Sequence, residues 1–191
     1  VENIHVPETV VLEGNKVWAD ANNQDGVRPD EITINIMNGT KVVESIKLSS
    51  GADKVWQDAE LEWKSSKLPK YENGVAIVYT AVEEDVPNYD EVTTGDMTKG
   101  FVTTNTHKTE TVDIPGVKTW TDANNQDGMR PTSITIRLLA DGKEVDHVTV
   151  TQKDNWNWKF TDLPKYNAGK EVKYTITEDP VTNYTTEVDG Y

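Results

Sequence analysis

The sequence predicts an all-β protein made of two tandem sandwich domains, and three observations support this prediction. A block of sequence occurs twice, as KVWADANNQDGVRP at residues 16–29 and as KTWTDANNQDGMRP at residues 118–131. Short runs rich in Val, Ile, Thr and Tyr alternate with clusters of Gly, Asn, Asp and Pro, at the spacing typical of a β-sandwich. No segment keeps a helical period, so we expect little helix.

The repeat extends along the whole chain and divides it in two. LPKY occurs at residues 68–71 and again at 163–166, so the spacing between equivalent residues falls from 102 in the first block to 95 here. The first copy is therefore seven residues longer, and we expect the difference to lie in loops. We place the domains at residues 1–107 and 108–191, each large enough to bury its own core.

The first strand of each copy carries a lysine on its apolar face. Residues two apart in a strand share a face, and here that face reads Val10, Leu12, Gly14, Lys16, Trp18 in the first copy and Val112, Ile114, Gly116, Lys118, Trp120 in the second. A lysine that points toward a core needs a partner or a reaction. The alternative is a lysine whose stem packs while its charged end reaches solvent.

The next two strands form a hairpin in each copy. The alternating series Ile32, Ile34, Ile36 and Ile134, Ile136, Leu138 are typical of strands with one wet face. Each series is followed by a strong hairpin signal, Asn38-Gly39 or Asp141-Gly142, and then by a further strand at residues 41–48 or 143–150.

A later strand places a glutamate on the apolar side of each copy. The alternating residues are Ile77, Tyr79, Ala81, Glu83 and Val172, Tyr174, Ile176, Glu178. Burial disfavours charge, so it lowers the pKa of a lysine and raises that of a glutamate. A neutral amine is a nucleophile and a protonated carboxyl is a hydrogen-bond donor, so such a pair could attack a nearby side-chain amide. That reaction needs an Asn.

Four ordered blocks, each found twice, resemble the Cna protein B-type domain, the stalk repeat of Gram-positive surface adhesins. They are the Lys with its following Trp, ANNQDG with Arg and Pro, LPKY, and the Tyr-Thr-x-x-Glu strand; a strand ending in Thr-Asn-Thr-His closes the first copy. The resemblance implies immunoglobulin-like, prealbumin-like β-sandwiches in which a Lys in the first strand and an Asn in the last form an isopeptide bond promoted by the Glu. Carried over, Lys16 is the nucleophile, Asn105 the acceptor and Glu83 the promoter.

The second copy matches the family only in part. Lys118 and Glu178 are present, but the sequence ends at Tyr191 before a strand with an Asn, so we expect this domain to lack its last strand and Lys118 to have no acceptor of its own. Residues 1–5 resemble the last strand of a preceding repeat, because Asn3 and His5 precede Lys16 as Asn105 and His107 precede Lys118. Asn3 is thus a possible orphan acceptor. Chains could exchange strands head to tail, although we expect a monomer with a frayed N-terminus.

Three other motifs have simpler interpretations. The ANNQDG block offers oxygens for calcium, but its Gly stands seventh instead of sixth and Ser133 replaces the closing Glu31, so we favour a tight turn with positive φ at Gly26 and Gly128. Repeated tryptophans (Trp18 with Trp120, Trp63 with Trp158) fit core packing. Trp56 has no evident counterpart and is the aromatic that we expect to be exposed. The histidines His5, His107 and His147 are too scattered for a metal site.

Composition narrows the function. A net charge of -14, spread along the chain, argues against nucleic acid as a partner. The chain has no Cys, no membrane-spanning apolar run and no catalytic triad motif, so we expect no metal, no cofactor and no turnover enzyme. We expect a segment of a longer, extracellular, cell-wall-attached adhesin, with neighbouring repeats as partners and a stalk function. The alternative is a module that binds a host glycoprotein or matrix.

Overall fold

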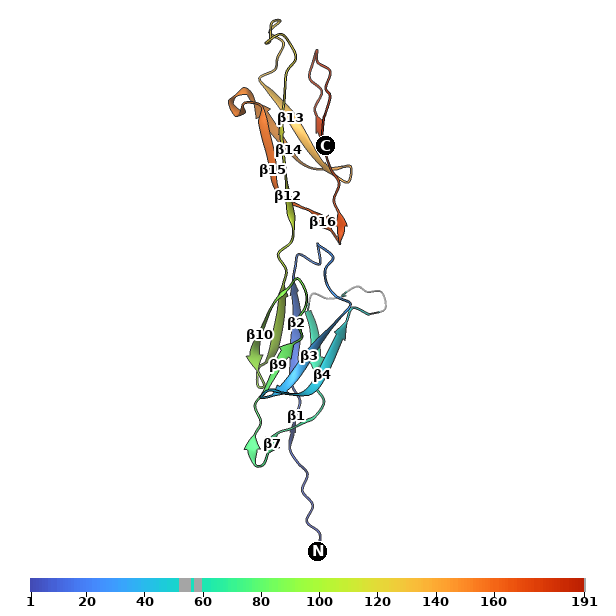
Figure 1. Ribbon diagram of the computed structural model, residues 1–191, viewed down its shortest axis with the longest axis vertical. Helices are drawn as coiled ribbons and strands as arrows, with labels where there is room; N and C mark the ends of the chain where they lie inside the picture. The colour runs from blue at the N-terminus through green and yellow to red at the C-terminus, as the bar shows by residue number, and fades with distance from the viewer. Residues whose placement is uncertain (52–55, 57–59, 191) are drawn as a thin grey trace. The chain divides into compact units, whose positions relative to one another are not determined.

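The structure is a computed structural model that describes residues 1–51, 56 and 60–190, and it confirms the all-β class. The chain divides into two compact units, Val1–Thr109 (unit 1) and Glu110–Tyr191 (unit 2), each treated by itself below (Figure 1). Within the described part, the only helix is the short 3-10 turn η1 (Gln152–Asp154), and no helix has the length and apolar character to cross a bilayer.

The first sheet of unit 1 contains the predicted lysine strand. It has four strands in the order β10-β11-β2-β5, with bounds β2 Glu13–Ala19, β5 Glu60–Lys64, β10 Asp90–Asp96 and β11 Gly100–Thr106. β2 and β11, the first and last long strands of the unit, lie side by side and run parallel, whereas the other pairs are antiparallel. β11 is therefore covered on both edges, and β10 pairs with β11 alone.

The second sheet of unit 1 contains the predicted glutamate strand. Its order is β4-β3-β9, with bounds β3 Glu31–Asn38, β4 Lys41–Ser49 and β9 Tyr79–Glu83. The turn at Gly39 joins β3 to β4, as the Asn-Gly signal predicted. Two short pairs complete the unit, β1 (Thr9–Val10) with β6 (Leu68–Pro69) and β7 (Tyr71–Glu72) with β8 (Val75–Ala76).

The core of unit 1 fills the space between these sheets. Alternate residues of β2, β3 and β9 point into it, which is the period-2 pattern expected of strands with one wet face. The buried apolar side chains are Leu12, Trp18, Ile32, Ile34, Ile36, Trp56, Trp63, Leu68, Tyr79, Ala81, Val86 and Phe101. Gly14 lies under the ring of Trp63, where a Cβ would come within 2.5 Å of the indole. The glycine in this apolar series thus makes room for a tryptophan.

Unit 2 repeats part of this plan. Its three-stranded sheet has the order β14-β13-β18, with bounds β13 Ser133–Ala140, β14 Lys143–Thr151 and β18 Tyr174–Glu178. Its other sheet has two strands, β12 (Thr111–Val117) and β15 (Asn157–Pro164), and a short pair joins β16 (Tyr166–Asn167) to β17 (Lys170–Glu171). A separate core forms around Ile114, Ile136, Leu138, Val150, Phe160 and Ile176.

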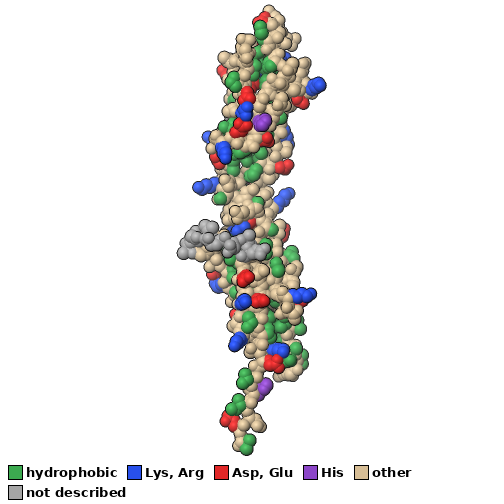
Figure 2. Space-filling model, turned by 180° about the vertical axis from the view of Figure 1, so that it is seen from behind, with side chains coloured by type: hydrophobic (Ala, Val, Ile, Leu, Met, Phe, Trp, Pro, Cys, Tyr) green, Lys and Arg blue, Asp and Glu red, His purple; other side chains and the backbone are tan. Residues whose placement is uncertain are grey.

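The described part of unit 2 contains no counterpart of β10 or β11. The residues after Glu178 form no strand up to residue 190, although Val181, Asn183 and Tyr184 match Val86, Asn88 and Tyr89 at the entrance to β10. In unit 1 β10 pairs with β11, and among the described residues of unit 2 no such strand lies beside the matching segment. Acidic and basic side chains are interspersed on the face of both units that Figure 2 shows.

Candidate cross-linking site

The site of unit 1 is built around Lys16, at the centre of β2. Its residue is fully buried, at 0% exposure, and its ammonium lies 4.0 Å from the ring centroid of Trp18. Nζ donates a hydrogen bond to the Val17 carbonyl at 3.0 Å. Burial lowers the pKa of Lys16 to about 8, although the nearby Glu83 carboxylate partly offsets this shift. The structure thus confirms that Lys16 faces the core and excludes, for this lysine, a charged end that reaches solvent.

Glu83 reaches the same point from the opposite sheet. It is the last residue of β9, and its Oε1 lies 3.7 Å from the Lys16 Nζ, with both side chains at 0% exposure. Burial raises the pKa of Glu83, against the opposing influence of Lys16 and Asn105. Burial is the largest cause of the pKa shifts of both Lys16 and Glu83. Each group is moved toward its neutral form, an amine and a carboxylic acid.

Asn105 comes from β11, beside the lysine strand. In the parallel register Asn105 pairs with Trp18 and Thr103 with Lys16, and Asn105 is 0% exposed. Its amide lies close enough to Glu83 to lower the pKa of that carboxyl, yet it falls short of hydrogen-bond geometry. Neither amide atom of Asn105 and neither carboxyl oxygen of Glu83 has a hydrogen-bond partner. Such a cluster destabilises the fold, because each buried polar group without a hydrogen-bond partner costs about 1–3 kcal/mol of stability.

An aromatic and ionic cluster lies next to this site. The Trp18 ring packs on Tyr89 at a centroid distance of 5.0 Å, and the Tyr89 hydroxyl donates to Asp20 Oδ2 at 2.8 Å. Asp20 also accepts two hydrogen bonds from the Arg28 guanidinium, at 2.6 and 2.7 Å. Burial opposes ionisation of Asp20, but the hydrogen bonds from Arg28, the Asn23 amide and Tyr89 outweigh it and lower its pKa.

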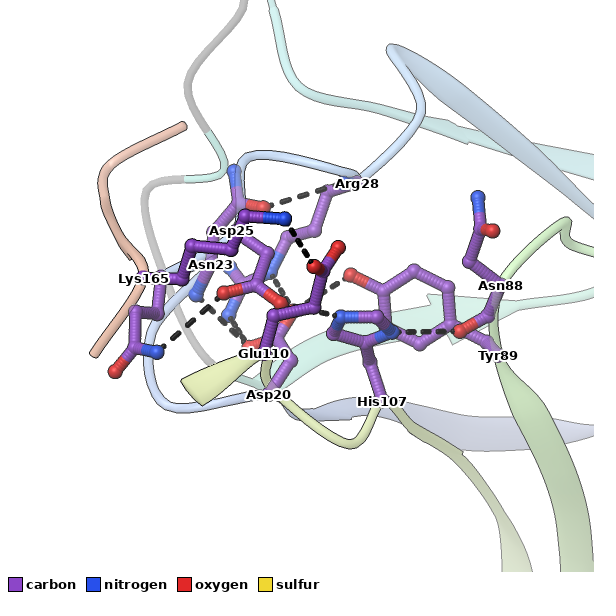
Figure 3. Close-up of polar contacts among 10 residues, drawn as sticks. Asp20, Asn23, Asp25, Arg28, Asn88, Tyr89, His107, Glu110 and Lys165 are labelled. Atoms are coloured by element: carbon purple, nitrogen blue, oxygen red, sulfur yellow. Dashed lines mark hydrogen bonds and ion pairs between the residues drawn. The ribbon is translucent and has the colours of Figure 1, made fainter. Parts of the chain in front are cut away.

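His107 closes the cluster just beyond the end of β11. Its Nε2 lies 2.9 Å from Asp25 Oδ2 and its Nδ1 lies 2.8 Å from the Asn88 carbonyl oxygen (Figure 3). Partial burial lowers the pKa of His107, but its hydrogen bonds to Asp25 and Asn88 outweigh burial and raise it. The Asn-x-His end of the last strand is therefore held at two points, Asn105 in the core and His107 on the turn.

The described part of unit 2 brings together the lysine and the glutamate of the same site. Lys118 follows directly after β12 and is not in a strand, and its Nζ forms an ion pair with Glu178 Oε2 at 2.9 Å. The Lys118 side chain is 15% exposed where that of Lys16 is 0%. Glu178 also accepts a hydrogen bond from the Thr186 hydroxyl at 2.6 Å. No Asn of the described part of unit 2 takes the position that Asn105 holds in unit 1.

Comparison with known proteins decides the family. The model of the Cna protein B-type domain matches residues 12–106 and 114–191. The chain belongs to the Cna protein B-type domain family. A collagen adhesin of Staphylococcus aureus is 35% identical over all 191 residues, which span 16% of its length. The crystal structure of two B repeat units of the collagen binding protein of the same organism is 36% identical, with a TM-score of 0.82 over 95% of this chain and 48% of that one.

The prediction that Trp56 is exposed was wrong. Trp56 is 8% exposed, its ring packs on Trp18 at 5.3 Å, and its indole N–H donates to the Pro29 carbonyl. It also has a counterpart, because Trp156 packs on Trp120 at 5.1 Å. The different loop length before each residue hid the equivalence. Among the repeated tryptophans, Trp18 and Trp63 are buried, while Trp120 and Trp158 are partly buried against the core of unit 2.

The ANNQDG block is a turn in both Cna B-type domains, as predicted. Gly26 and Gly128 have φ values of 69° and 66°, and the two Ala-Asn-Asn triplets, residues 21–23 and 123–125, also lie in the left-handed region. The aspartate just before each block binds an arginine, Asp20 with Arg28 and Asp122 with Arg130. The described residues include no group of three or more acidic, His or Cys side chains placed to hold a metal.

Sequence reasoning missed the partners of this turn. It named neither arginine of the two ion pairs as part of the site, nor Tyr89, nor its equivalent Tyr184, whose hydroxyl donates to Asp122 at 3.0 Å. A usable signal was present, because Asn-Tyr follows the glutamate strand at the same spacing in both copies, at residues 88–89 and 183–184.

Proposed function

We propose that Lys16 and Asn105 form a spontaneous isopeptide bond and that unit 1 is a covalently closed segment of a surface-protein stalk. The observation that carries this proposal is the fully buried trio of Lys16, Glu83 and Asn105, whose carboxyl and amide atoms lack hydrogen-bond partners. Membership in the Cna B-type family supports it.

The reaction needs only these three residues. The neutral Lys16 Nζ attacks the Asn105 Cγ, while protonated Glu83 donates a hydrogen bond to the amide oxygen and stabilises its developing charge. The Nζ–Cγ bond forms, the Cγ–Nδ2 bond breaks, and ammonia leaves with protons that Glu83 relays from Nζ. The product is a neutral secondary amide whose N–H can donate to the Glu83 carboxyl, which removes part of the cost of the unsatisfied groups.

The bond would serve a mechanical role. It joins the first and last long strands of the unit, which lie side by side in one sheet, so a pull on the chain ends would pass through the amide instead of through the fold. By the loop-closure model used for disulfides, a closure of this length adds about 4–5 kcal/mol. It needs no thiol, and the chain has no cysteine. We infer a stalk segment of a Gram-positive cell-wall adhesin, with neighbouring repeats as its partners.

Intact-mass measurement under denaturing conditions tests the proposal. We expect the monomer to weigh less than its sequence by one ammonia, and Glu83→Ala to restore the full mass. Glu84→Ala is the matched control, because this neighbouring carboxylate is exposed and lies outside the trio; it should keep the mass loss. A wild-type monomer with its full sequence mass would end the proposal.

A further inference from the structure

We propose that Glu91 is a positioning residue of the cross-linking site, and that its negative charge sets the pH range in which Lys16 and Asn105 react. The inference rests on the chemistry proposed for unit 1, and it adds a fourth residue and a dependence on pH. Glu91 forms and breaks no bond in the reaction and acts on the reacting groups through its charge. It lies in β10, a strand that contributes no residue to the trio.

The register of the first sheet places Glu91 beside the acceptor. Glu91 pairs with Asn105 across the antiparallel strands β10 and β11, and residues directly opposite each other in such a pair lie on the same face of the sheet. That face is the inner one, because Asn105 is fully buried. Glu91 itself is exposed, since β10 is the edge strand of its sheet. A carboxylate in contact with water therefore lies at the border of the buried trio.

Two threonines hold Glu91 in this place. The Thr93 hydroxyl donates a hydrogen bond to Glu91 Oε1, and it lies 2.8 Å from the Thr103 hydroxyl. Because Thr93 has a single hydroxyl hydrogen and an ionised carboxylate can only accept, Thr103 is the donor of the second hydrogen bond. Thr103 is 0% exposed and pairs with Lys16 in the parallel register. A chain of hydrogen bonds thus connects the exposed carboxylate to the strand position beside the nucleophile.

An inward-facing charge on an edge strand has a simpler interpretation. Such charges keep the edge from pairing with a strand of another chain. β10 already carries exposed carboxylates at its two ends, Asp90 and Asp96. Protection of an edge requires no connection to the core, whereas Glu91 is connected to it through Thr93 and Thr103. This connection favours a role in the site.

The charge of Glu91 acts on both groups that exchange a proton in the reaction. Burial is the largest influence on them, leaving the pKa of Lys16 lowered, to about 8, and that of Glu83 raised. The Glu91 carboxylate raises both pKa values, because a negative charge favours the more positive form of its neighbours. Glu91 therefore moves upward the pH at which the Lys16–Glu83 pair loses each of its two titrating protons.

The reactive form of the pair holds one of these protons, on Glu83, while Lys16 is neutral. At low pH both groups are protonated and at high pH both are deprotonated, so the rate of bond formation should pass through a maximum between these limits. Because the Glu91 charge moves both protonation steps upward, it also moves this maximum toward higher pH. Without that charge the site would react best in more acidic solution.

The other charged groups around the site come from the ANNQDG turn and from the end of β11. The Arg28 guanidinium lowers the pKa of Lys16, and it forms an ion pair with Asp20. His107 titrates near neutral pH, and its Nε2 lies 2.9 Å from Asp25 Oδ2. These groups are the same in the wild type and in variants of β10. Their influence on the pH profile is therefore common to all the chains compared.

The rate of bond formation as a function of pH tests the inference. The full chain is made with a photocaged lysine at position 16, uncaged in urea and refolded by dilution, so that the reaction starts at a known time. Acid-quenched samples are analysed by intact mass for the loss of one ammonia, from about pH 5 to about pH 9. Tryptophan fluorescence shows when folding is complete at each pH.

Removal of the charge should have opposite effects at the two ends of this range. We expect Glu91→Gln to slow the reaction about three- to tenfold at the alkaline end and to accelerate it by a similar factor at the acidic end, as for one partly screened charge. Glu91 is exposed and Gln can accept the same hydrogen bond, so this variant should fold normally. Thr93→Val, which releases the carboxylate, should give a smaller shift in the same direction.

Asp90→Asn is the matched control. It removes the same charge from the adjacent position of β10, whose side chain lies on the opposite face of the strand. We expect its pH profile to stay close to that of the wild type.

Three results would overturn the inference and leave the function of unit 1 intact. One is a pH profile of Glu91→Gln that coincides with that of the wild type. Another is a rate lowered by the same factor at every pH, which would show that Glu91 only supports the fold of the edge. The third is an equal shift in Asp90→Asn. Failure of the proposed function appears separately, as a wild-type chain that loses no ammonia at any pH.

Discussion

Lys16 and Lys118 stand in nearly the same sequence, each two residues before a tryptophan and each facing a glutamate, yet they lie in different surroundings. Lys16 is sealed in the core, 3.7 Å from Glu83. Lys118 keeps 15% of its side chain exposed and holds a short ion pair with Glu178. The difference is the strand β11, which covers Lys16 and has no counterpart in the described part of unit 2. The repeated motif supplies a lysine and a glutamate in both units, and in unit 1 burial lowers the pKa of the lysine and raises that of the glutamate.

The largest expected effect comes from removing the acceptor of unit 1. Asn105→Ala abolishes the proposed bond, so we expect the free energy of unfolding of unit 1 to fall by about 4–5 kcal/mol from lost loop closure alone. Scanning calorimetry should show the transition of unit 1 moving down while that of unit 2 stays in place. Lys118→Ala is the control and should leave unit 1 unchanged. A transition temperature of unit 1 that is unchanged in Asn105→Ala would contradict the cross-link.

Breaking the aspartate–arginine ion pair should also destabilise unit 1 more than unit 2. Arg28 and Asp20 have side chains 4% and 1% exposed, against 20% and 11% for Arg130 and Asp122. Arg28→Ala leaves a buried carboxylate unpaired and should cost about 3–5 kcal/mol, whereas Arg130→Ala should cost less because water can reach Asp122. Urea unfolding followed by tryptophan fluorescence measures both. Equal losses would show that the open edge of unit 2 does not hydrate this pair.

The two glycines beneath the tryptophans sharpen the comparison further. A Cβ at Gly14 would meet the Phe101 carbonyl oxygen of β11 at 2.6 Å as well as the Trp63 ring, whereas at Gly116 the closest atoms all belong to the Trp158 ring. A side chain can move and a strand backbone cannot. We expect Gly14→Ala to cost about 1–3 kcal/mol by overpacking and Gly116→Ala to cost less. Thermal melting of the two variants decides the order.

The smallest expected effect is a pH dependence confined to unit 1. The folded-state pKa of His107 is raised above its ordinary value, so its stabilisation is complete below about pH 6.5 and is lost as the pH rises through the folded-state pKa. His107→Gln should therefore cost about 0.5–1.5 kcal/mol at pH 6 and less at pH 9. His5→Gln is the control, because His5 is exposed and outside every described strand, and it should show no such trend. A loss of stability in His107→Gln that grows with pH would contradict a raised pKa for His107.

Much of the fold was predictable because its signals are local. Alternation placed Lys16 and Glu83 on core-facing strands, and the Asn-Gly and Asp-Gly turns placed the hairpins. The position of Asn105 was different, because it came from the family resemblance and no local pattern marks an acceptor. Its neighbour across the parallel pair is almost ninety residues away in sequence, and such contacts leave no periodic trace.

The expectations for Trp56 and for the strand at Lys118 failed for the same reason, because both depend on residues distant in sequence. Trp56 is buried through contacts with Trp18 and the Pro29 carbonyl, both far from it in sequence. Lys118 was expected on a strand, and β12 ends one residue before it. A strand exists only where a neighbour supplies its hydrogen bonds, and residue alternation cannot report whether that neighbour is present.

The parallel pairing of β2 and β11 has one more consequence. If unit 1 is pulled from its two ends, β2 is drawn toward its own start and β11 toward its own finish, so the strands slide past each other lengthwise. Their six residue pairs, from Phe101 with Gly14 to Thr106 with Ala19, are then loaded in shear and resist together instead of opening one after another like a zipper. Even before any covalent bond forms, this parallel pairing therefore makes the mechanical unfolding of unit 1 cooperative.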